Sequence, residues 1–163
     1  VREMVMMGRY SRKKMFEQDD ERDLEVTEKA LSMVGMQGTE ERSFLSLSGG
    51  EKQRIYLAMA FAQESSLIIL DEPTNHLDIG YQLYIMEIMR QFEDKTIFTS
   101  VHDMNLAARY CDRIILLQKG KIIANGTPEE VLTVERIRSV FHVNTEIEKK
   151  NGVLNITYLG WTK

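Results

Sequence analysis

The sequence predicts an α/β protein in which a helical segment precedes strands that alternate with helices around a parallel sheet. Apolar residues before residue 65 recur with helical spacing, whereas short apolar or β-branched runs alternate with amphipathic stretches after it. The run Leu67–Leu70 is apolar throughout, which is typical of a buried strand in a parallel sheet. Strand–helix alternation favours such a sheet. We therefore expect two parts, residues 1–64 and residues 65–163.

The first part is predicted to be helical. It comprises a short helix over Glu3–Gly8, a basic connector over Arg9–Lys14 and a long helix over Asp19–Met36. One face of the long helix carries Leu24, Thr27, Leu31 and Val34. Its acidic first turns suit the positive end of a helix dipole, and Gly35 and Gly38 are expected to end it. The acidic run over Glu17–Glu28 is interpreted as a solvated helix face.

The second part is predicted to contain several strands and helices. They are strands over Leu67–Leu70, Thr96–Ser100, Arg113–Leu117 and Lys121–Ala124, and helices over Ile79–Phe92 and Met104–Tyr110. Thr127–Glu130 (TPEE) forms a capping box with proline at the first helical position. Asn151 and Gly152 predict a type I′ turn between strands over Thr145–Lys149 and Val153–Tyr158.

Composition excludes several classes of protein. The 163 residues carry 21 basic and 25 acidic side chains, and a net charge of −4 argues against general binding to nucleic acid or anionic membranes. The single cysteine, Cys111, cannot form an intrachain disulfide, and three histidines add too few ligands for a structural zinc site. The longest apolar run, Ile55–Ala62, is far below the ~20 residues of a membrane-spanning helix. The cytosol is the expected compartment.

The first motif with chemical meaning is Leu47–Arg54 (LSGGEKQR), which opens an amphipathic helix. Ser48 is a good N-cap residue, and Gly49 and Gly50 allow backbone N–H groups to approach a ligand closely. Free N–H groups at a helix N-terminus together with a hydroxyl favour phosphate binding. The alternative is a simple turn before a helix.

The second motif is Leu67–Pro73 (LIILDEP), an apolar strand that ends in two adjacent carboxylates. Ligands bind at the carboxyl edge of open α/β sheets. Asp71 could hold Mg²⁺ through its water shell, and Glu72 could orient or deprotonate an attacking water. The alternative is a strand that ends in a polar turn.

A third feature lies at the same predicted edge. The strand over Thr96–Ser100 is followed by His102, which could reach a phosphate or its attacking water. A lone histidine after a strand is more often structural.

Together and in this order, these motifs resemble the nucleotide-binding subunits of ABC transporters, from Val1 to about Leu132. Leu47–Gln53 resembles the family's signature loop, with Glu51 where glutamine is commonest, and Leu67–Pro73 resembles the Walker B strand. Thr74–Asp78 resembles the D-loop, and His102 the switch histidine. The segments Val1–Tyr10, His102–Ala107 and Gly120–Leu132 are similar to importers of iron–siderophore complexes, haem and vitamin B12.

The resemblance implies a P-loop NTPase fold, with a helical signature subdomain (1–64) and the C-terminal half of the ATPase core (65–163). It implies that the protein hydrolyses ATP to power import, with Asp71 holding Mg²⁺ and with Glu72 and His102 as catalytic residues. Ser48, Gly49, Gly50 and Glu51 would bind ATP held by a second subunit in a head-to-tail dimer, and Asp78 would link the two sites. Transmembrane permease subunits are the other implied partners, nucleic acid is not, and the implied location is the cytoplasmic face of the cell membrane.

One family motif does not occur in these residues: the phosphate-cradling loop GxxxxGK(S/T), also called Walker A. Gly120 and Lys121 supply the dipeptide, but Ile122 follows it and strands flank it. The Q-loop glutamine and the adenine-stacking aromatic residue are not found either. We therefore expect this chain to be the C-terminal portion of such a subunit, with little ATPase activity alone.

Three alternative functions remain open. A soluble, ribosome-associated ABC ATPase would share Asn75–Asp78, although no basic arm for RNA is present. A non-catalytic module could lend its signature loop to a complete partner. A metal hydrolase could be built on Asp71, Glu72 and His102, but the signature helix would then have no role.

Overall fold

A computed structural model describes residues 1–13 and 18–162. The chain forms two compact units, Val1–Ser100 and Val101–Lys163. This is a division by packing. The predicted division into residues 1–64 and 65–163 concerns subdomains of the family and stays a prediction.

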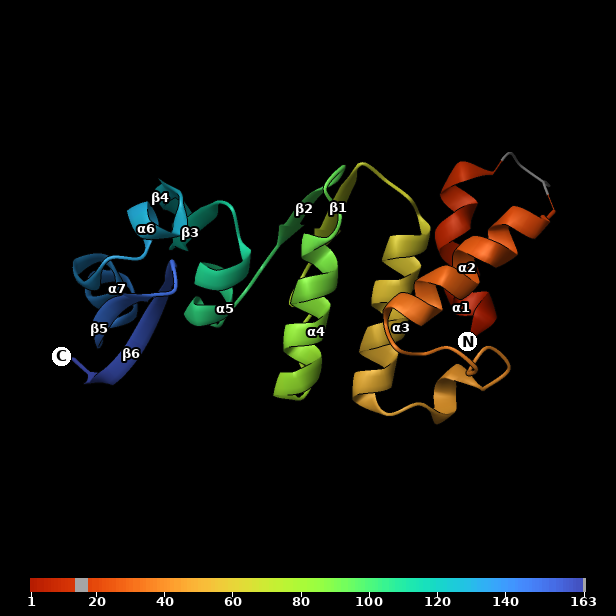
Figure 1. The fold of residues 1–163 in the computed structure, drawn as a ribbon, viewed down its shortest axis with the longest axis horizontal. Coiled ribbons are helices and arrows are strands. Elements are labelled where there is room, and N and C mark those ends of the chain that lie inside the picture. Colours follow the sequence, from red (N-terminus) through yellow and green to blue (C-terminus); the bar gives the residue numbers. More distant parts are fainter. Residues whose placement is uncertain (14–17, 163) are drawn as a thin grey trace. The chain divides into compact units, whose positions relative to one another are not determined.

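The first unit contains most of the helices and one parallel strand pair (Figure 1). Its elements are α1 (Arg2–Met6), η1 (Met7–Arg12), α2 (Glu21–Met33), η2 (Phe44–Ser46), α3 (Gly49–Ala62), β1 (Leu67–Leu70), α4 (Ile79–Arg90) and β2 (Thr96–Thr99). The expected basic connector over Arg9–Lys14 was wrong as far as Arg12, because these residues continue α1 as a 3₁₀ helix. Residues 14–17 lie outside the described part.

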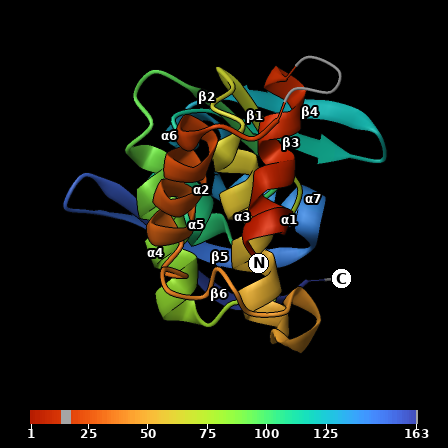
Figure 2. The same cartoon turned by 90° about the vertical axis from the view of Figure 1, so that its right-hand side faces the viewer.

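Helices α1, α2 and α3 pack against one another, as Figure 2 shows from the N-terminal side. Val5, Leu31 and Ile55 are fully buried and supply one apolar residue from each helix. Gly8 makes the closest approach, because a Cβ atom at this position would lie 2.2 Å from the carbonyl oxygen of Met59. A glycine therefore allows the backbones of η1 and α3 to touch.

Helix α2 is shorter than predicted because both of its ends are capped. Asp20 and Asp23 form a capping box at the start. At the end, the N–H of Gly35 donates to Ser32 and that of Met36 donates to Leu31, the two hydrogen bonds of a Schellman motif. The glycine adopts a φ of 65°, as its predicted role as helix terminator requires.

The face of α2 that is buried differs from the predicted face. Thr27, Leu31 and Val34 are buried as expected, but Leu24 is 41% exposed. Asp23 is buried instead, so the interpretation of the acidic run as a solvated face was wrong at this residue. A buried carboxylate requires charged partners, and the structure supplies them.

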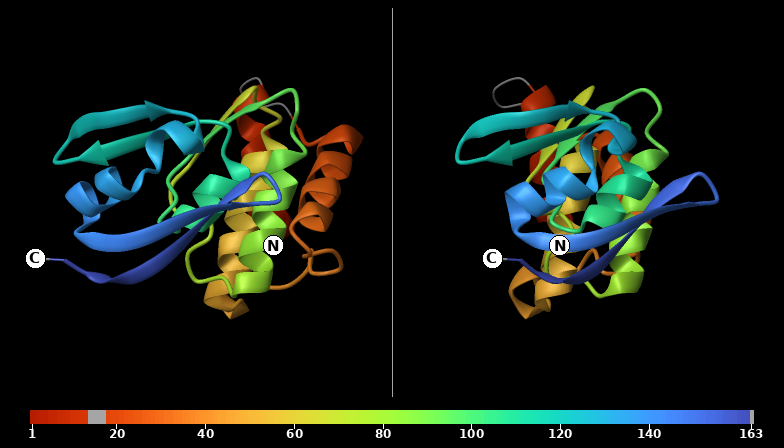
Figure 3. Two further views of the ribbon diagram at one scale, coloured as in Figure 1. Left: turned by 60° about the vertical axis from the view of Figure 1, so that its left-hand side comes forward. Right: turned by 90° about the vertical axis from the view of Figure 1, so that its left-hand side faces the viewer.

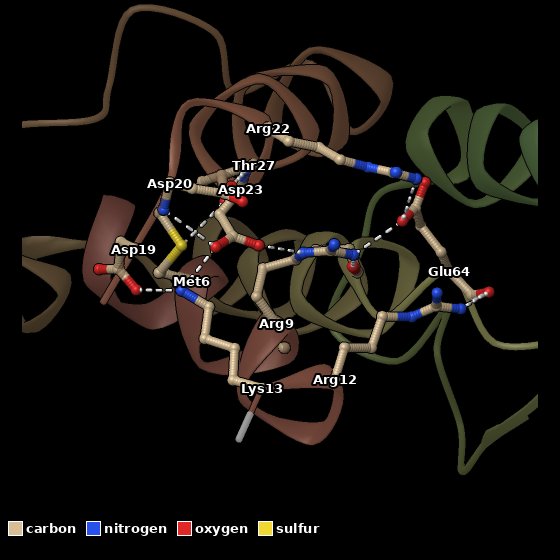
Figure 4. A network of polar contacts seen from close by, with 12 residues as sticks. Met6, Arg9, Arg12, Lys13, Asp19, Asp20, Arg22, Asp23, Thr27 and Glu64 are labelled. Atoms are coloured by element: carbon tan, nitrogen blue, oxygen red, sulfur yellow. Dashed lines mark hydrogen bonds and ion pairs between the residues drawn. The ribbon is translucent and has the colours of Figure 1, made fainter. Parts of the chain in front are cut away.

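A polar network surrounds Asp23 and the C-terminal end of α3 (Figure 4). Asp23 accepts a hydrogen bond from the buried Arg9 at 3.0 Å and forms an ion pair with Lys13 at 2.5 Å. Arg9 also donates to the carbonyl of Ala62 and to Glu64, while Arg12 donates to the carbonyls of residues 63 and 64. These guanidinium groups satisfy the last carbonyls of α3, which have no partner within the helix.

Strands β1 and β2 form the predicted parallel pair, in a register that places Leu67 opposite Thr96 and Leu70 opposite Thr99. The expectation that β1 is fully buried was wrong. Ile68 is buried, but Leu67 and Ile69 are 50% and 70% exposed, as is Phe98 on β2 at 55%. One face of this pair is therefore apolar and accessible.

The second unit combines two antiparallel hairpins with three short helices. Its elements are α5 (Met104–Tyr110), β3 (Ile114–Gln118), β4 (Lys121–Gly126), α6 (Pro128–Val131), α7 (Val134–Phe141), β5 (Val143–Lys150) and β6 (Val153–Trp161). The capping box of α6 is confirmed. Asn151 and Gly152 both have positive φ, as the predicted type I′ turn requires.

A small apolar core holds the second unit together. Leu132, Ile137 and Ile156 are buried at its centre. Helix α7, which the sequence analysis did not predict, packs against β5, and α5 packs against β6 (Figure 3). Across residues 1–13 and 18–162, no helix has the length and apolarity that crossing a membrane requires.

Candidate functional site

Asp71 and Glu72 lie at the carboxyl end of β1, where a single hydroxyl connects them. The Oγ of Ser100 accepts a hydrogen bond from the N–H of Glu72 at 2.8 Å and donates to Oδ1 of Asp71 at 2.7 Å. Ser100 directly follows β2, so the parallel pairing brings it to the same edge. The hydroxyl thus fixes the backbone of one acidic residue and the side chain of the other.

The loop after β1 holds Glu72 in an unusual backbone conformation. Its φ is 48°, in the left-handed region that L-residues seldom adopt. The side-chain amide of Asn75 donates to the Glu72 carboxylate, and the N–H of Asn75 donates to the Glu72 carbonyl at 3.1 Å. A backbone held in this region by several hydrogen bonds is common at functional sites.

The predicted phosphate-binding segment forms the N-terminus of α3. Ser48 is the N-cap residue and forms a capping box with Glu51, and Gly49 and Gly50 occupy the first two helical positions. The Ser48 N–H donates to Glu51 at 2.8 Å, and Arg42 contacts the other carboxylate oxygen at 2.8 Å. These hydrogen bonds lower the pKa of Glu51 to about 2. Glu51 therefore stays ionised and shapes the helix N-terminus.

The two motifs touch each other within the first unit. The Gln53 side chain donates to the carbonyl of Glu72 at 3.4 Å. A Cβ atom on Gly50 would lie 3.3 Å from the carbonyl of His76, so the loop after β1 runs close to the start of α3. At the end of this loop, exposed Asp78 caps α4 by accepting a hydrogen bond from the N–H of Tyr81.

His102 belongs to the second unit. It is exposed and immediately precedes Asp103, the N-cap residue of α5. Oδ1 of Asp103 accepts hydrogen bonds from the N–H groups of Asn105 at 2.7 Å and Leu106 at 3.1 Å. The first turn of the helix after the histidine is therefore well capped.

The donor set at Asp71 suits a hard divalent cation. Asp71 is exposed, and the Ser100 hydroxyl orients its carboxylate. Magnesium is commonly bound by one or two carboxylates together with water and substrate phosphates. Within the described residues, no group of three or more His, Cys, Asp or Glu side chains could by itself hold a metal ion.

Sequence reasoning missed the residues that connect the predicted site residues. Ser100 was placed in a strand without a role, and Gln53 and Asn75 were noted only as members of motifs. Ser100 could have been found from its place in the sequence. It directly follows the second strand, and its hydroxyl is therefore expected at the same edge as the two carboxylates that follow the first strand.

Comparisons with known proteins agree on one family. The family profile described as ABC transporter matches residues 3–75. The chain is 39% identical over 150 residues to the petrobactin import ATP-binding protein FpuC of Bacillus anthracis, and 38% identical over 164 residues to the iron(3+)-hydroxamate import ATP-binding protein FhuC of Bacillus subtilis. These matches cover 90% and 97% of this chain but 55% and 61% of the two relatives. The chain thus spans little more than half the length of these curated relatives.

Solved structures give a similar result. A chain of an inward-facing ABC transporter superposes with a TM-score of 0.83 at 28% identity, covering 97% of this chain and 64% of that one. The dimeric bacterial ABC transporter cassette MJ0796 superposes with a TM-score of 0.68 at 26% identity, covering 76% and 54%.

Proposed function

Because this chain is similar to ABC transporter ATP-binding proteins over 90% or more of its length, we propose that it belongs to this family and is part of a subunit that hydrolyses ATP to power import. The observation that carries the proposal is the hydroxyl of Ser100, which holds Asp71 and Glu72 together at the carboxyl end of β1. Of two adjacent carboxylates at this position, one can bind a metal ion and the other can orient the attacking water.

In this proposal the acidic residues have separate roles. Asp71 would hold Mg²⁺, which neutralises developing charge on the phosphates when it is bound. Glu72 would orient the attacking water, with its carboxylate held by Asn75. His102 would contact the γ-phosphate.

The start of α3 would serve a second subunit. Its glycine N–H groups and the Ser48 hydroxyl would bind the γ-phosphate of ATP held by the partner in a head-to-tail dimer. Glu51 supports this role, because it fixes the Ser48 backbone through the capping box. Asp78 would link the two sites, since its loop approaches Gly50. The dimeric structure of the ABC transporter cassette MJ0796 provides a precedent for pairing two such chains.

Transmembrane permease subunits are the proposed second partner, at the cytoplasmic face of the cell membrane. The proposed cargo is an iron chelate, haem or cobalamin. The names of the similar proteins support this class, because they include importers of petrobactin, iron(3+)-hydroxamate and, in Halobacterium salinarum, cobalamin. Uptake assays with these three kinds of cargo, each in cells that lack their own ATP-binding subunit, would separate the possibilities.

The test of ATP hydrolysis uses a fusion protein, called the joined protein below. In it, this chain follows the part of FhuC that the chain does not cover, where the family resemblance implies Walker A. We expect this joined protein to hydrolyse ATP, and Glu72→Gln to lower its turnover at least about 100-fold, because a positioned carboxylate at the water contributes about that much. Glu129→Gln is the control, since Glu129 pairs only with Lys149 among the described ion pairs and lies outside the proposed site. Equal turnover of Glu72→Gln and the unchanged joined protein would contradict the proposal.

A further inference from the structure

The hairpin formed by β5 and β6 has no role in the proposed ATP site, yet it is bonded to the helix that follows His102. The side-chain amide of Asn105, in the first turn of α5, contacts the backbone of Ile156 on β6 twice. Its Oδ1 accepts a hydrogen bond from the Ile156 N–H at 2.8 Å, and its Nδ2 donates to the Ile156 carbonyl at 3.1 Å. The N–H and the carbonyl of Ile156 are therefore both hydrogen-bonded to one side chain.

This arrangement places Asn105 where a residue of a neighbouring strand would otherwise lie. A side-chain amide offers one acceptor and a donor in the same plane, as a peptide group does. Ile156 lies opposite Ile147 in the hairpin, and its own side chain is 3% exposed in the core beside Leu132 and Ile137. Ile156, to which Asn105 is hydrogen-bonded, is therefore held in place by the packing of its side chain in the core of the second unit.

A second residue of the hairpin contacts the same turn of α5. The hydroxyl of Tyr158, two positions beyond Ile156, lies close enough to the backbone of Met104 for this backbone to influence the pKa of Tyr158. Burial and the charge of Asp103 raise the pKa of Tyr158, so the hydroxyl stays protonated near neutral pH. Asp103 itself caps the helix. Of the three residues after His102, Asp103 thus caps the helix, Asn105 is hydrogen-bonded to the hairpin, and Met104 lies beside Tyr158.

We propose that the hairpin positions His102 through Asn105 and Tyr158, and that these two are positioning residues for ATP hydrolysis. The proposal rests on the proposed function, since His102 acts on the γ-phosphate only there. Asn105 is hydrogen-bonded to β6, and Asp103 caps α5 directly after His102, so the hairpin would restrain the backbone of the His102–Asp103 segment. A displacement of the hairpin would move the histidine.

The structural half of the proposal can be tested on the 163-residue chain. Tyr158→Phe removes only the hydroxyl, and Asn105→Asp keeps the shape but removes the donor to the Ile156 carbonyl. Asn155→Asp is the matched control, because Asn155 is an exposed neighbour of Ile156 on the same strand. The measurements are the imidazole NMR signals of the histidines and the hydrogen exchange of the amides of residues 104–107.

Tyr158→Phe and Asn105→Asp are both expected to shift the His102 signal, to leave that of His76 in place and to speed exchange in the first turn of α5. The expected acceleration is about twofold to tenfold, the range that the loss of one hydrogen bond produces. The control, Asn155→Asp, should change neither the His102 signal nor the exchange rates. An unmoved His102 signal in Tyr158→Phe and Asn105→Asp would overturn the proposal while leaving the proposed function intact.

The functional half uses the joined protein. Tyr158→Phe and Asn105→Asp are each expected to lower kcat severalfold with an unchanged KM for ATP, and to have no further effect in a His102→Ala background. Rates that fall by the same factor with and without His102 would overturn the proposal, because the residues would then act independently of it. Loss of hydrolysis in Glu72→Gln tests the proposed function separately, so the two failures can be distinguished.

Discussion

The Ser100 hydroxyl decides how the two acidic residues of the candidate site are held. It is the acceptor for the N–H of Glu72 and the donor to Asp71, so its loss would affect both at once. Neither acidic residue would be removed. The role of Ser100 can therefore be separated from theirs by a single substitution.

Ser100→Ala is expected to lower ATP turnover of the joined protein about fivefold and to destabilise the 163-residue chain by about 1 kcal/mol, because the N–H of Glu72 loses its partner. Ser100→Thr keeps the hydroxyl and should restore both. Turnover assays and urea unfolding check this. Ser66→Ala is the control, because Ser66 is exposed and lies just before β1. An equal loss of turnover and stability in Ser66→Ala would refute the role assigned to Ser100.

The buried carboxylate of Asp23 makes the free energy of unfolding depend on pH. Hydrogen bonds from Lys13, Arg9 and the backbone of Asp20 hold the pKa of Asp23 well below its usual value, against the opposing effect of burial. Since the folded pKa is depressed, the ionised carboxylate stabilises the fold fully above the unfolded pKa of about 4. That contribution is lost as the pH falls from there toward the folded pKa.

Asp23→Asn should destabilise the chain by about 3 kcal/mol at pH 7, because Arg9 and Lys13 would lose their buried partner. The difference from the unchanged chain should shrink as the pH falls below about 4. Urea unfolding between pH 7 and pH 2 measures this. Glu25→Gln on the exposed face of α2 is the control. A difference that stays constant with pH would show that the charge of Asp23 is not responsible.

At the scale of elements, most capped helices could be recognised from local sequence, with α7 as an exception, but the contacts between helices could not. The type of α5 and the ends of α3 and α6 are set by capping residues that can be recognised in the sequence. The contact of η1 with α3 depends on Gly8, which the sequence analysis treated only as the end of a helix. The close approach to Met59 lies fifty-one residues along the chain and has no local signal.

Gly8→Ala is therefore expected to destabilise the chain by about 1–3 kcal/mol, because its Cβ would force two backbones apart. Thermal or urea unfolding measures the loss. Gly49→Ala is the matched control for stability, since a Cβ atom there meets nothing within 4 Å. Equal stability of the two variants would contradict the close packing of η1 on α3.

At the scale of the whole molecule, the fold class is confirmed. Helices and small sheets superpose on an ABC transporter chain with a TM-score of 0.83, as the resemblance implied. The β1–β2 pair is parallel as predicted, and the described strands form three two-stranded sheets. The resemblance to the importer branch agrees with the names of the similar proteins reported above.

The 163-residue chain alone is expected to bind MgATP weakly, because the 163 residues contain no GxxxxGK(S/T) loop to surround the phosphates with N–H groups. Joining the Walker A portion of FhuC should restore binding. Calorimetric titration of both proteins under identical conditions checks this. Binding of similar strength in both would mean that another element, starting with Ser48, Gly49 and Gly50, cradles the nucleotide.

The sequence by itself determined the family resemblance, the type of most elements, the turn at Asn151–Gly152 and the motifs that carry Asp71 and Glu72. These features depend on residues close together in the chain, so local pattern was sufficient. Only the tertiary structure decided that Asp23 is buried with Arg9, that Ser100 joins the two acidic residues and that Asn105 grips Ile156. Each of these contacts joins residues from different elements, and a hydrogen bond or ion pair forms only where folding brings both groups within about 3 Å.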